Sequence, residues 1–427
     1  MPRPGCLWIA YSGGVDSSVL LNLLSRNREK LQSDIVAVHI NHQLSADAES
    51  WVEHCRNKCE KENIRLEIIT IDAKKPKGHS QEAYARELRY AALKNLMGMD
   101  DLLLTGHHKD DQAETLILQL MRGAGPDGLA AMPSVRKLGQ GWLVRPLLDF
   151  SRNEIKDYAQ VQGLEWIDDQ SNQDTDIDRN YIRNHVIPCL QERWPSVIKI
   201  LARSAGHQAD AAYLLREIAE KDFEQIRGKQ PDVLDITGLK NMPDVRMRNV
   251  IRYWLKKNGH QPASATVMDI IIGELVYAGD DKVPVVKWHE TEVRRYRNNI
   301  YVMKPLAKIS SEMEVTWNLE QPLEIDSGRL MAKRVIGRGL RSASINGNNV
   351  QVRYRRGGET IRPAGRKETH KLKKLFQETA VPSWQRDRVP LIFINNKLAA
   401  VTGCWIDDSF NAGEAEQGWE FTLTEYK

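Results

Sequence analysis

The chain has 427 residues, of which 28% are charged and 41% are hydrophobic, and its formal net charge is +4 at pH 7. This length exceeds one ordinary hydrophobic core, so two or three domains are expected. No apolar run reaches the roughly 20 residues of a membrane span, and the N-terminus lacks the apolar segment of a signal peptide. These features argue against membrane insertion and export, and they predict a cytoplasmic globular protein.

Five cysteines are present, and none forms a Cys-x-x-Cys pair. Cys55 and Cys59 are four residues apart in a predicted helix, where buried thiols are expected rather than a metal site. Reduced thiols of this kind fit the cytosol.

The first strong motif is a glycine- and serine-rich loop between an apolar run at 7–11 and a segment of helical periodicity. This context predicts a strand, a tight turn and a helix. Adjacent glycines let the backbone approach a ligand, and the amides of a helix N-terminus favour phosphate. A carboxylate beside phosphate needs an intervening cation, which makes Asp16 a candidate Mg²⁺ ligand; the alternative is a turn in which Asp16 only caps the helix. The predicted phosphate-binding residues are Ser12, Gly13, Gly14, Val15, Asp16 and Ser17.

Short apolar runs alternate with helical patterns over the first two hundred residues or so. This alternation predicts an α/β domain with a Rossmann-like parallel sheet and crossover helices. Loops at the carboxyl ends of parallel strands build the ligand crevice, so the loops at 12–17, 39–42 and 106–111 are expected to converge. A mostly helical domain and a small α+β domain are expected to follow. We divide the chain at 1–205, 206–325 and 326–427, the last beginning with a linker before a core from about Val350.

A second cluster of polar residues follows the run Leu102–Leu104. Asp110 and Asp111 precede Glu114 by four and three residues, which brings three carboxylates together at one end of a helix. Such acids repel one another unless a cation compensates, and a metal or a substrate ammonium would do so. The alternative is a helix N-terminus at which acids favour the dipole, but that does not explain the adjacent His107 and His108.

Three further groups are weaker candidates. His39 could meet an adenine or ribose, or be a hydrogen-bonded structural residue. Arg86 could bind phosphate or lie on an exposed helix face. Arg179 and Arg183 are four residues apart, so a helix there would display both on one face. Between 351 and 375, nine Lys or Arg residues stand against two Glu, an excess suited to a polyanion or simply to a solvated face.

Several of these motifs together resemble the tRNA(Ile)-lysidine synthetase family, whose Ser-Gly-Gly-Val-Asp-Ser loop is that of the N-type ATP pyrophosphatases. The resemblance covers nearly the whole chain. Its motifs are the loops and helices at 12–17, 39–42, 86–89 and 106–115, then 121–125, 128–132, 145–148, 169–172, 179–184, 357–359, 371–376, 381–382 and Trp384.

The resemblance implies a ligase that uses ATP and Mg²⁺ and acts on L-lysine and isoleucine tRNA with a CAU anticodon. The wobble cytidine O2 would attack the α-phosphate, and the lysine ε-amine would then displace AMP at C2. The lysidine so formed would change codon reading from AUG to AUA. A homodimer is an expectation that the sequence leaves open.

The resemblance also suggests a role for each candidate residue. The loop at 12–17, with His39 and Arg86, would bind the nucleotide. Asp16 would hold the metal and, with Asp110, Asp111, Glu114 and Arg122, serve catalysis. The three acids Asp110, Asp111 and Glu114 would also recognise lysine. The tRNA contacts would be Arg179, Arg183, Arg355, Arg356, Lys371, Lys373 and Lys374.

Three other functions compete with this one. A tRNA thiolase of the same superfamily would need a sulfur-handling cysteine near the site, and none is expected there. A small-molecule ligase would not need the basic C-terminal domain. A nucleotide sensor or RNA-binding module without turnover would gain nothing from three crowded acids.

Overall fold

The computed structural model describes residues 5–43, 47–72, 81–169, 173–279, 284–345 and 349–425. The chain forms two compact units, residues 1–217 and 218–427. The boundary falls inside one long helix, α10 (Val197–Ile226).

The first unit is built on a sheet of six strands in the order β3-β2-β1-β4-β6-β5. Its first five strands in that order are parallel, and β5 pairs antiparallel with β6. This arrangement confirms the predicted α/β fold with a parallel sheet. The strands are β1 (Cys6–Ala10), β2 (Asp34–Asn41), β3 (Arg65–Thr70), β4 (Leu102–Leu104), β5 (Val135–Leu138) and β6 (Gly141–Val144).

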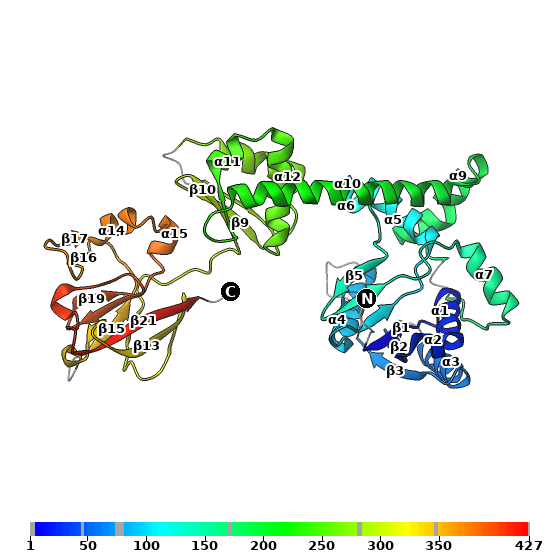
Figure 1. The fold of residues 1–427 in the computed structure, drawn as a ribbon, viewed down its shortest axis with the longest axis horizontal. Helices are drawn as coiled ribbons and strands as arrows, with labels where there is room; N and C mark the ends of the chain where they lie inside the picture. Colours follow the sequence, from blue (N-terminus) through cyan, green and yellow to red (C-terminus); the bar gives the residue numbers. More distant parts are fainter. Residues whose placement is uncertain are drawn as a thin grey trace. The chain divides into compact units, whose positions relative to one another are not determined.

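Helices cover both faces of this sheet (Figure 1). One face packs against α1, α3 and α7 through a core that includes Leu20, Cys55 and Ile155, and the other packs against α4 through Leu93 and Met97. The helices of this unit besides α10 are α1 (Val15–Arg26), α2 (Arg28–Leu31), α3 (Ala48–Lys61), α4 (Gln81–Leu96), α5 (Lys109–Met121), α6 (Pro126–Leu129), α7 (Arg152–Val161), α8 (Asp178–Tyr181) and α9 (Ile187–Arg193).

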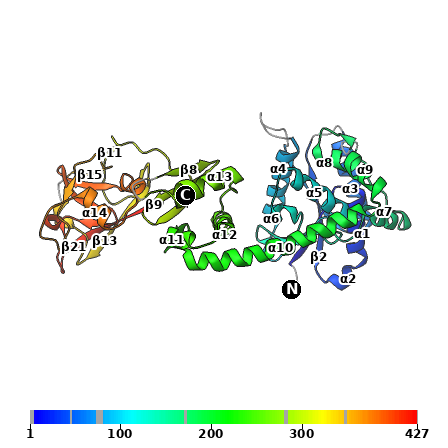
Figure 2. The ribbon, with the colours of Figure 1, turned by 90° about the horizontal axis from the view of Figure 1, so that it is seen from above.

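The expected arginine-bearing helix begins at Asp178, as α8, and continues through a π-helical segment, Ile182–Val186, into α9. Figure 2 shows α8 and α9 beside α5. Part of the motif at 169–172 lies outside the described residues, because only Asp169 of these four is described.

The second unit begins with a four-stranded sheet in the order β7-β10-β9-β8. Three helical segments pack on it around the fully buried Trp254. β9 and β10 pair antiparallel as a hairpin. The elements are β7 (Val233–Asp235), α11 (Ile236–Lys240), α12 (Asp244–Lys257), α13 (Ala265–Ile270), which continues as a π-helical segment to Val276, β8 (Val285–Trp288), β9 (Thr291–Tyr296) and β10 (Asn299–Met303).

The C-terminal part of this unit is rich in strands. Its larger elements are β11 (Glu314–Thr316), β12 (Leu323–Ile325), β13 (Gly328–Ile336), β15 (Val350–Arg353), α14 (Leu372–Glu378), α15 (Ser383–Arg386), β18 (Leu391–Ile394), β19 (Lys397–Val401) and β21 (Gln417–Glu425). The shorter ones are β14 (Leu340–Arg341), β16 (Thr360–Ile361), β17 (His370–Lys371) and β20 (Trp405–Ile406).

The stretch expected to be a linker before Val350 forms strands instead. β13 pairs with β21 over nine residues, and β14 pairs with β21 as well. The polar, glycine-rich sequence of this stretch hid the strands, because each of them buries only one face. The division into three domains stays a prediction. No helix of the described residues is long and apolar enough to cross a membrane.

Candidate active site

The glycine- and serine-rich loop is held in shape by its own hydroxyl groups. Ser17 Oγ donates to the Gly14 carbonyl at 2.9 Å and accepts from the Ser12 amide at 3.3 Å. Gly13 has φ +85°, and an added Cβ would lie 2.8 Å from Ile167 Cδ1. Gly14 is the N-cap residue of α1 and provides no capping side chain. The loop therefore presents the N-terminus of a twelve-residue helix, which suits a phosphate group.

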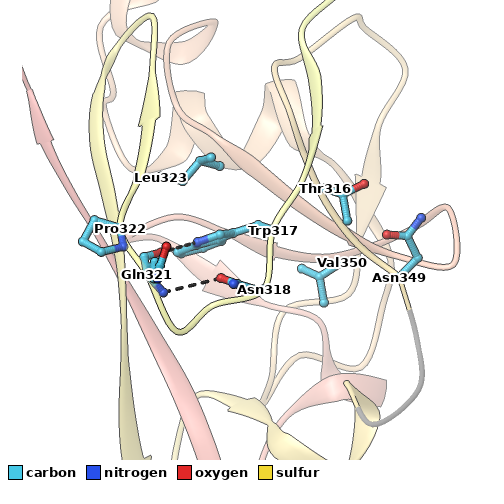
Figure 3. Close-up of a pocket in the computed structure, with 8 residues that line it drawn as sticks. All are labelled: Thr316, Trp317, Asn318, Gln321, Pro322, Leu323, Asn349 and Val350. Atoms are coloured by element: carbon cyan, nitrogen blue, oxygen red, sulfur yellow. Dashed lines mark hydrogen bonds between the residues drawn. The ribbon is translucent and has the colours of Figure 1, made fainter.

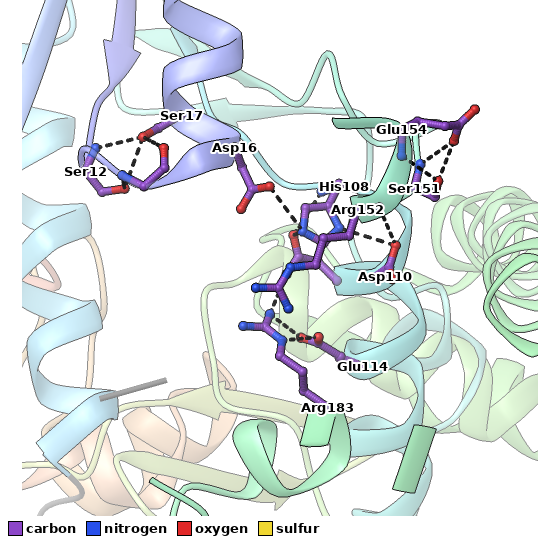
Figure 4. Close-up of polar contacts among 12 residues, drawn as sticks. Ser12, Asp16, Ser17, His108, Asp110, Glu114, Ser151, Arg152, Glu154 and Arg183 are labelled. Atoms are coloured by element: carbon purple, nitrogen blue, oxygen red, sulfur yellow. Dashed lines mark hydrogen bonds and ion pairs between the residues drawn. The ribbon is translucent and has the colours of Figure 1, made fainter. Parts of the chain in front are cut away.

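Asp16 stands in the first turn of α1 and faces a buried histidine (Figure 4). Its Oδ1 atom is buried, accepts no hydrogen bond and lies 3.7 Å from His108 Nε2. Burial raises the pKa of Asp16, and His108 opposes that shift. An added Cβ on Gly106 would lie 3.0 Å from the Asp16 carbonyl carbon, so the loop after β4 can approach α1 this closely only with glycine there.

His108 is the centre of the acidic cluster and is only 2% exposed. Its ring nitrogens lie 3.6 Å from Asp110 Oδ2 and 3.6 Å from Asp111 Oδ2. Burial lowers the pKa of His108, but Asp110, Asp111 and Asp16 outweigh it and raise the pKa above its ordinary value. When it is protonated, His108 offsets part of the negative charge of these carboxylates. Asp110 Oδ2 also accepts the Arg152 amide at 2.9 Å, which fixes it to the start of α7.

Glu114 and Asp111 are paired with two arginines. The Glu114 carboxylate, 1% exposed, accepts from Arg179 Nε at 2.8 Å and from Arg183 Nε at 2.6 Å. Asp111 Oδ1 accepts from Arg179 Nη2 at 2.9 Å and from Arg183 Nη2 at 3.2 Å. The helix formed by α8 and the following π-helical segment is thereby tied to α5.

The compensating cation predicted for the crowded acids is thus supplied by the chain itself. We expected a metal or a substrate ammonium beside Asp111 and Glu114, and in this structure two guanidinium groups fill that place. Arg179 and Arg183 were predicted as tRNA contacts. Their side chains are only 21% and 20% exposed, and their guanidinium groups donate hydrogen bonds to these acids.

Two histidines near the carboxyl edge of the sheet, His39 and His107, have lowered pKa values. His39 Nδ1 lies 3.0 Å from the Tyr11 carbonyl oxygen, and the residue is 5% exposed, so its hydrogen bond is to the backbone directly after β1. Burial lowers the pKa of His39. Burial, followed by the charges of Arg145 and two other arginines, lowers the pKa of His107 to about 3, although Asp111 acts in the opposite direction.

Two other predicted site arginines, Arg122 and Arg86, have no contact with the acidic cluster among the interactions of the described residues. Arg122 is the C-cap residue of α5 and is exposed, eight residues and therefore about 12 Å of helix beyond Glu114. The structure does not bring it to the acidic cluster. Arg86 lies on α4 with its guanidinium over the Tyr90 ring, 5.1 Å from the ring centre.

Some basic residues of the C-terminal part form ion pairs with acidic side chains, and others are exposed to solvent. Arg355 pairs with Asp387 at 3.0 Å, and Arg356 lies 3.5 Å from a Glu314 oxygen. Lys371, Lys373 and Lys374 are exposed, and α14 buries Leu372, Leu375 and Phe376 on its other side. These three lysines form an outward basic face.

Sequence reasoning missed two groups at the site. Arg152, whose backbone amide donates to Asp110, was not among the predicted site residues. Arg145, directly after β6, is 4% exposed and was noted only as part of the motif at 145–148. Its place after a strand of the parallel sheet was the signal that could have marked it.

A separate hollow of about 450 Å³ lies in the second unit, beside Trp317 (Figure 3). Trp317 Nε1 donates to the Gln321 carbonyl at 2.7 Å across one wall. The residues that line it are Thr316, Trp317, Asn318, Gln321, Pro322, Leu323, Asn349 and Val350. None of them is titratable at physiological pH, so the hollow offers no acid or base for chemistry.

Known protein families match three parts of the chain. The model of the PP-loop domain matches residues 2–190, the TilS substrate binding domain matches 234–301, and the TilS substrate C-terminal domain matches 350–423. In its fold, this chain is similar over 47% of its length to 70% of a U34-tRNA thiolase from Methanococcus maripaludis, with 17% identity and a TM-score of 0.40.

Full-length relatives are more similar. The tRNA(Ile)-lysidine synthase of Coxiella burnetii is 41% identical over 96% of this chain and 91% of its own length. That of Methylococcus capsulatus is 40% identical over 97% of this chain and 95% of its own length. With the PP-loop at the carboxyl edge of the sheet and relatives this similar along almost the entire chain, the protein belongs to the tRNA(Ile)-lysidine synthase family.

Proposed function

We propose that this chain ligates L-lysine to C2 of the wobble cytidine of isoleucine tRNA with a CAU anticodon, using ATP and releasing AMP and pyrophosphate. The observation that carries the proposal is the phosphate-binding loop at 12–17 facing the acidic cluster around His108 across the carboxyl edge of one sheet. A site that joins a phosphate to a nucleophile needs these two surfaces together.

The loop would hold the pyrophosphate portion of ATP through the amides at the start of α1 and the hydroxyls of Ser12 and Ser17. Asp16 fits a Mg²⁺ ion, because its buried Oδ1 has no hydrogen-bond donor. Among the described residues no three His, Cys, Asp or Glu side chains could hold a metal together. This agrees with a Mg²⁺ that takes one carboxylate and completes its coordination with phosphates and water. When bound, the ion would neutralise phosphate charge.

The two steps balance without further reactants. The cytidine O2 forms a bond to the α-phosphorus, and pyrophosphate leaves. The lysine ε-amine then forms a bond to C2, AMP leaves, and the amine gives up its proton to a nearby base. Asp110 is the acid best suited to that proton transfer, since Asp111 and Glu114 already accept from two guanidiniums. The wobble base must leave its stack to reach the site.

Lysine recognition would rest on the same acids. A lysine ammonium can bind Asp111 or Glu114 only by sharing them with, or displacing, a guanidinium group. The two arginine side chains therefore occupy the position that the substrate ammonium would take, and the acids are already arranged to bind a positive charge. We assign no chemical role to Arg122.

The tRNA would lie against the basic face of Lys371, Lys373 and Lys374. Replacing all three with Gln should weaken tRNA binding at least tenfold, because each exposed lysine that meets a phosphate releases counterions. The salt dependence of binding should fall with it. Unchanged affinity would remove this face from the interface. The homodimer and the cytoplasmic location stay predictions.

The decisive experiment measures incorporation of labelled lysine into two unmodified transcripts, isoleucine tRNA(CAU) and elongator methionine tRNA, with ATP. Lysine should enter the first transcript alone. Asp16→Asn keeps the side-chain shape and should lower the rate at least a hundredfold by removing the metal ligand. Asp127→Asn is the matched control, since Asp127 is an exposed acid of the same unit, 3.5 Å from Arg216, and should leave the rate unchanged.

Each result leads to a definite conclusion. If AMP and pyrophosphate form with tRNA while no lysine enters, adenylation stands and lysine is the wrong nucleophile. If neither forms, or if both transcripts accept lysine equally, the proposed function is wrong.

A further inference from the structure

Four arginines surround one aromatic ring on the α4 side of the sheet. Tyr90 lies on α4, and the guanidinium carbons of Arg86, Arg89 and Arg136 lie 5.1, 5.7 and 5.0 Å from its ring centre. Arg145 lies near enough for its charge to help lower the pKa of Tyr90. We call these four arginines and Tyr90 the arginine cluster. Three elements build it: α4, the edge strand β5 and the residue after β6.

The arginine cluster is partly buried in the fold, unlike a run of charges exposed to solvent. Arg145 is 4% exposed, one of its terminal nitrogens donates to the Pro133 carbonyl, and its buried Nε has no partner. The Nε of Arg136 is also buried without a partner. Within the part of the chain that the structure describes, no ion pair joins Arg86, Arg136 or Arg145 to a carboxylate. Positive charge held this closely, with donors left over, calls for an anion from outside the chain.

The positive charge of the arginine cluster shifts the pKa values of neighbouring groups. Burial raises the pKa of Tyr90, yet the four arginines outweigh it and hold the pKa below its ordinary value. Burial lowers the pKa of Arg145, and Arg136 and Arg86 lower it further. Two arginines of the cluster, Arg145 and Arg86, also lower the pKa of His107 in the loop after β4. The cluster therefore borders the candidate active site.

Its position differs from that of the phosphate-binding loop. Arg145 follows β6, which lies two strands from β1 in the sheet order, or about 10 Å away at the usual strand spacing. A nucleotide whose pyrophosphate sits on the loop at 12–17 leaves this second site for another phosphate. The macromolecular substrate brings one, because the wobble base is joined through its ribose to the RNA backbone.

We propose that the arginine cluster binds the backbone phosphodiester next to the wobble cytidine and so holds the extruded nucleotide over the site. This rests on the proposed function, since it takes the phosphate from the tRNA. The planar guanidiniums of Arg136 and Arg145 give two-pronged contacts to phosphate oxygens. Tyr90 keeps the guanidiniums apart and oriented by stacking. The other source of the same chemistry is the γ-phosphate of ATP, and the experiment separates the two.

The protein-side test is Arg136→Gln, with Lys137→Gln as its matched control. Lys137 is the next residue of β5, is exposed and stacks over Trp142, so this variant loses the same charge outside the cluster. Arg136→Gln should raise the KM for tRNA about tenfold while kcat and the KM for ATP stay near wild type. The slope of log Kd for tRNA against log salt should fall by about 0.7, as expected for one lost single-strand phosphate contact. Lys137→Gln should change neither quantity.

The RNA-side test uses the wild-type chain and full-length tRNA with one uncharged methylphosphonate linkage, placed on the 5′ or the 3′ side of the wobble cytidine. One of the two should raise the KM for tRNA about as much as Arg136→Gln does. With the Arg136→Gln enzyme, the same linkage should have no further effect. This non-additivity identifies the phosphate that the arginine meets.

Three outcomes would overturn the inference. A raised KM for ATP with an unchanged KM for tRNA would assign the cluster to the nucleotide. Equal effects of Arg136→Gln and Lys137→Gln would show that only the total positive charge of this region matters for tRNA binding, not a contact made by the arginine cluster. Full additivity of the variant and the methylphosphonate would show that the two do not meet. None of these outcomes affects the proposed function, which is tested separately by lysine incorporation into the two unmodified transcripts with the wild-type enzyme.

Discussion

Removing the charge of Glu114, which pairs with Arg179 and Arg183, should destabilise the first unit. Glu114→Gln keeps the side-chain shape but removes the charge and turns an amide toward the Arg Nε donors. Removing one partner of a buried ion pair costs about 3–5 kcal/mol, and we expect about 3 kcal/mol because one carbonyl acceptor remains. For a unit of this size each kcal/mol lowers the melting temperature by about 2–4 °C, so the shift should be about 6–12 °C.

Calorimetry of the full chain measures this shift, with the transition of the first unit identified as the one that ATP raises. Glu53→Gln is the matched control, because Glu53 lies 3.5 Å from Arg56 with both side chains mostly exposed. Such a surface pair contributes no more than about 1 kcal/mol. The double variant with Arg183→Gln should lose less than the sum of the two single variants, since the charge left unpaired by each is removed by the other. A Glu114→Gln shift no larger than that of Glu53→Gln, or additive losses in the double variant, would refute the reasoning.

Three other predictions follow from single residues. Gly13→Ala should destabilise the first unit by about 1–3 kcal/mol in urea unfolding, since φ +85° is strained for alanine and the added Cβ meets Ile167; a neutral result would contradict it. His107 stays neutral in the folded chain down to about pH 3, so below about pH 6.5 the unfolded chain binds more protons than the folded chain. The free energy of unfolding therefore falls as the pH drops through that window, by at most about 1.4 kcal/mol per pH unit. His107→Gln should flatten this slope in pH-dependent unfolding, and an unchanged slope would count against the prediction. Burial raises the pKa of Cys55 and Cys59 to about 12, so both thiols should react slowly with iodoacetamide in the native chain. Mass spectrometry should show labelling of the exposed Cys189 in the native chain, and labelling of Cys55 and Cys59 only after unfolding. Labelling of Cys55 in the native chain would disprove this prediction.

The sequence predicted the phosphate-binding loop and the sheet around it because both depend on local signals. Adjacent glycines and serines between an apolar run and a helical pattern determine a strand, a turn and a helix within about twenty residues. The order of strands and helices then placed three polar loops at one edge of the sheet. The need for a positive charge beside Asp110, Asp111 and Glu114 also followed from their spacing alone.

The source of that charge could not be read from the sequence. Arg179 and Arg183 lie more than sixty residues from the acids they meet, and a pair of arginines four apart looks the same on a solvated or RNA-binding helix as on a buried one. The sequence also gave no reason to separate Arg122 from the acids, because distance along a helix matters only once the site has a position.

What the sequence by itself determined is the chemistry available: a loop for phosphate, acids that need a cation, and basic residues for a polyanion. The tertiary structure decided which charges meet. It paired Asp111 and Glu114 with two arginines, held His39 to the backbone of Tyr11, and gathered four arginines around Tyr90. The physical reason is that charge interactions depend on separation in space and on burial, and both are set by the packing of elements distant in the chain.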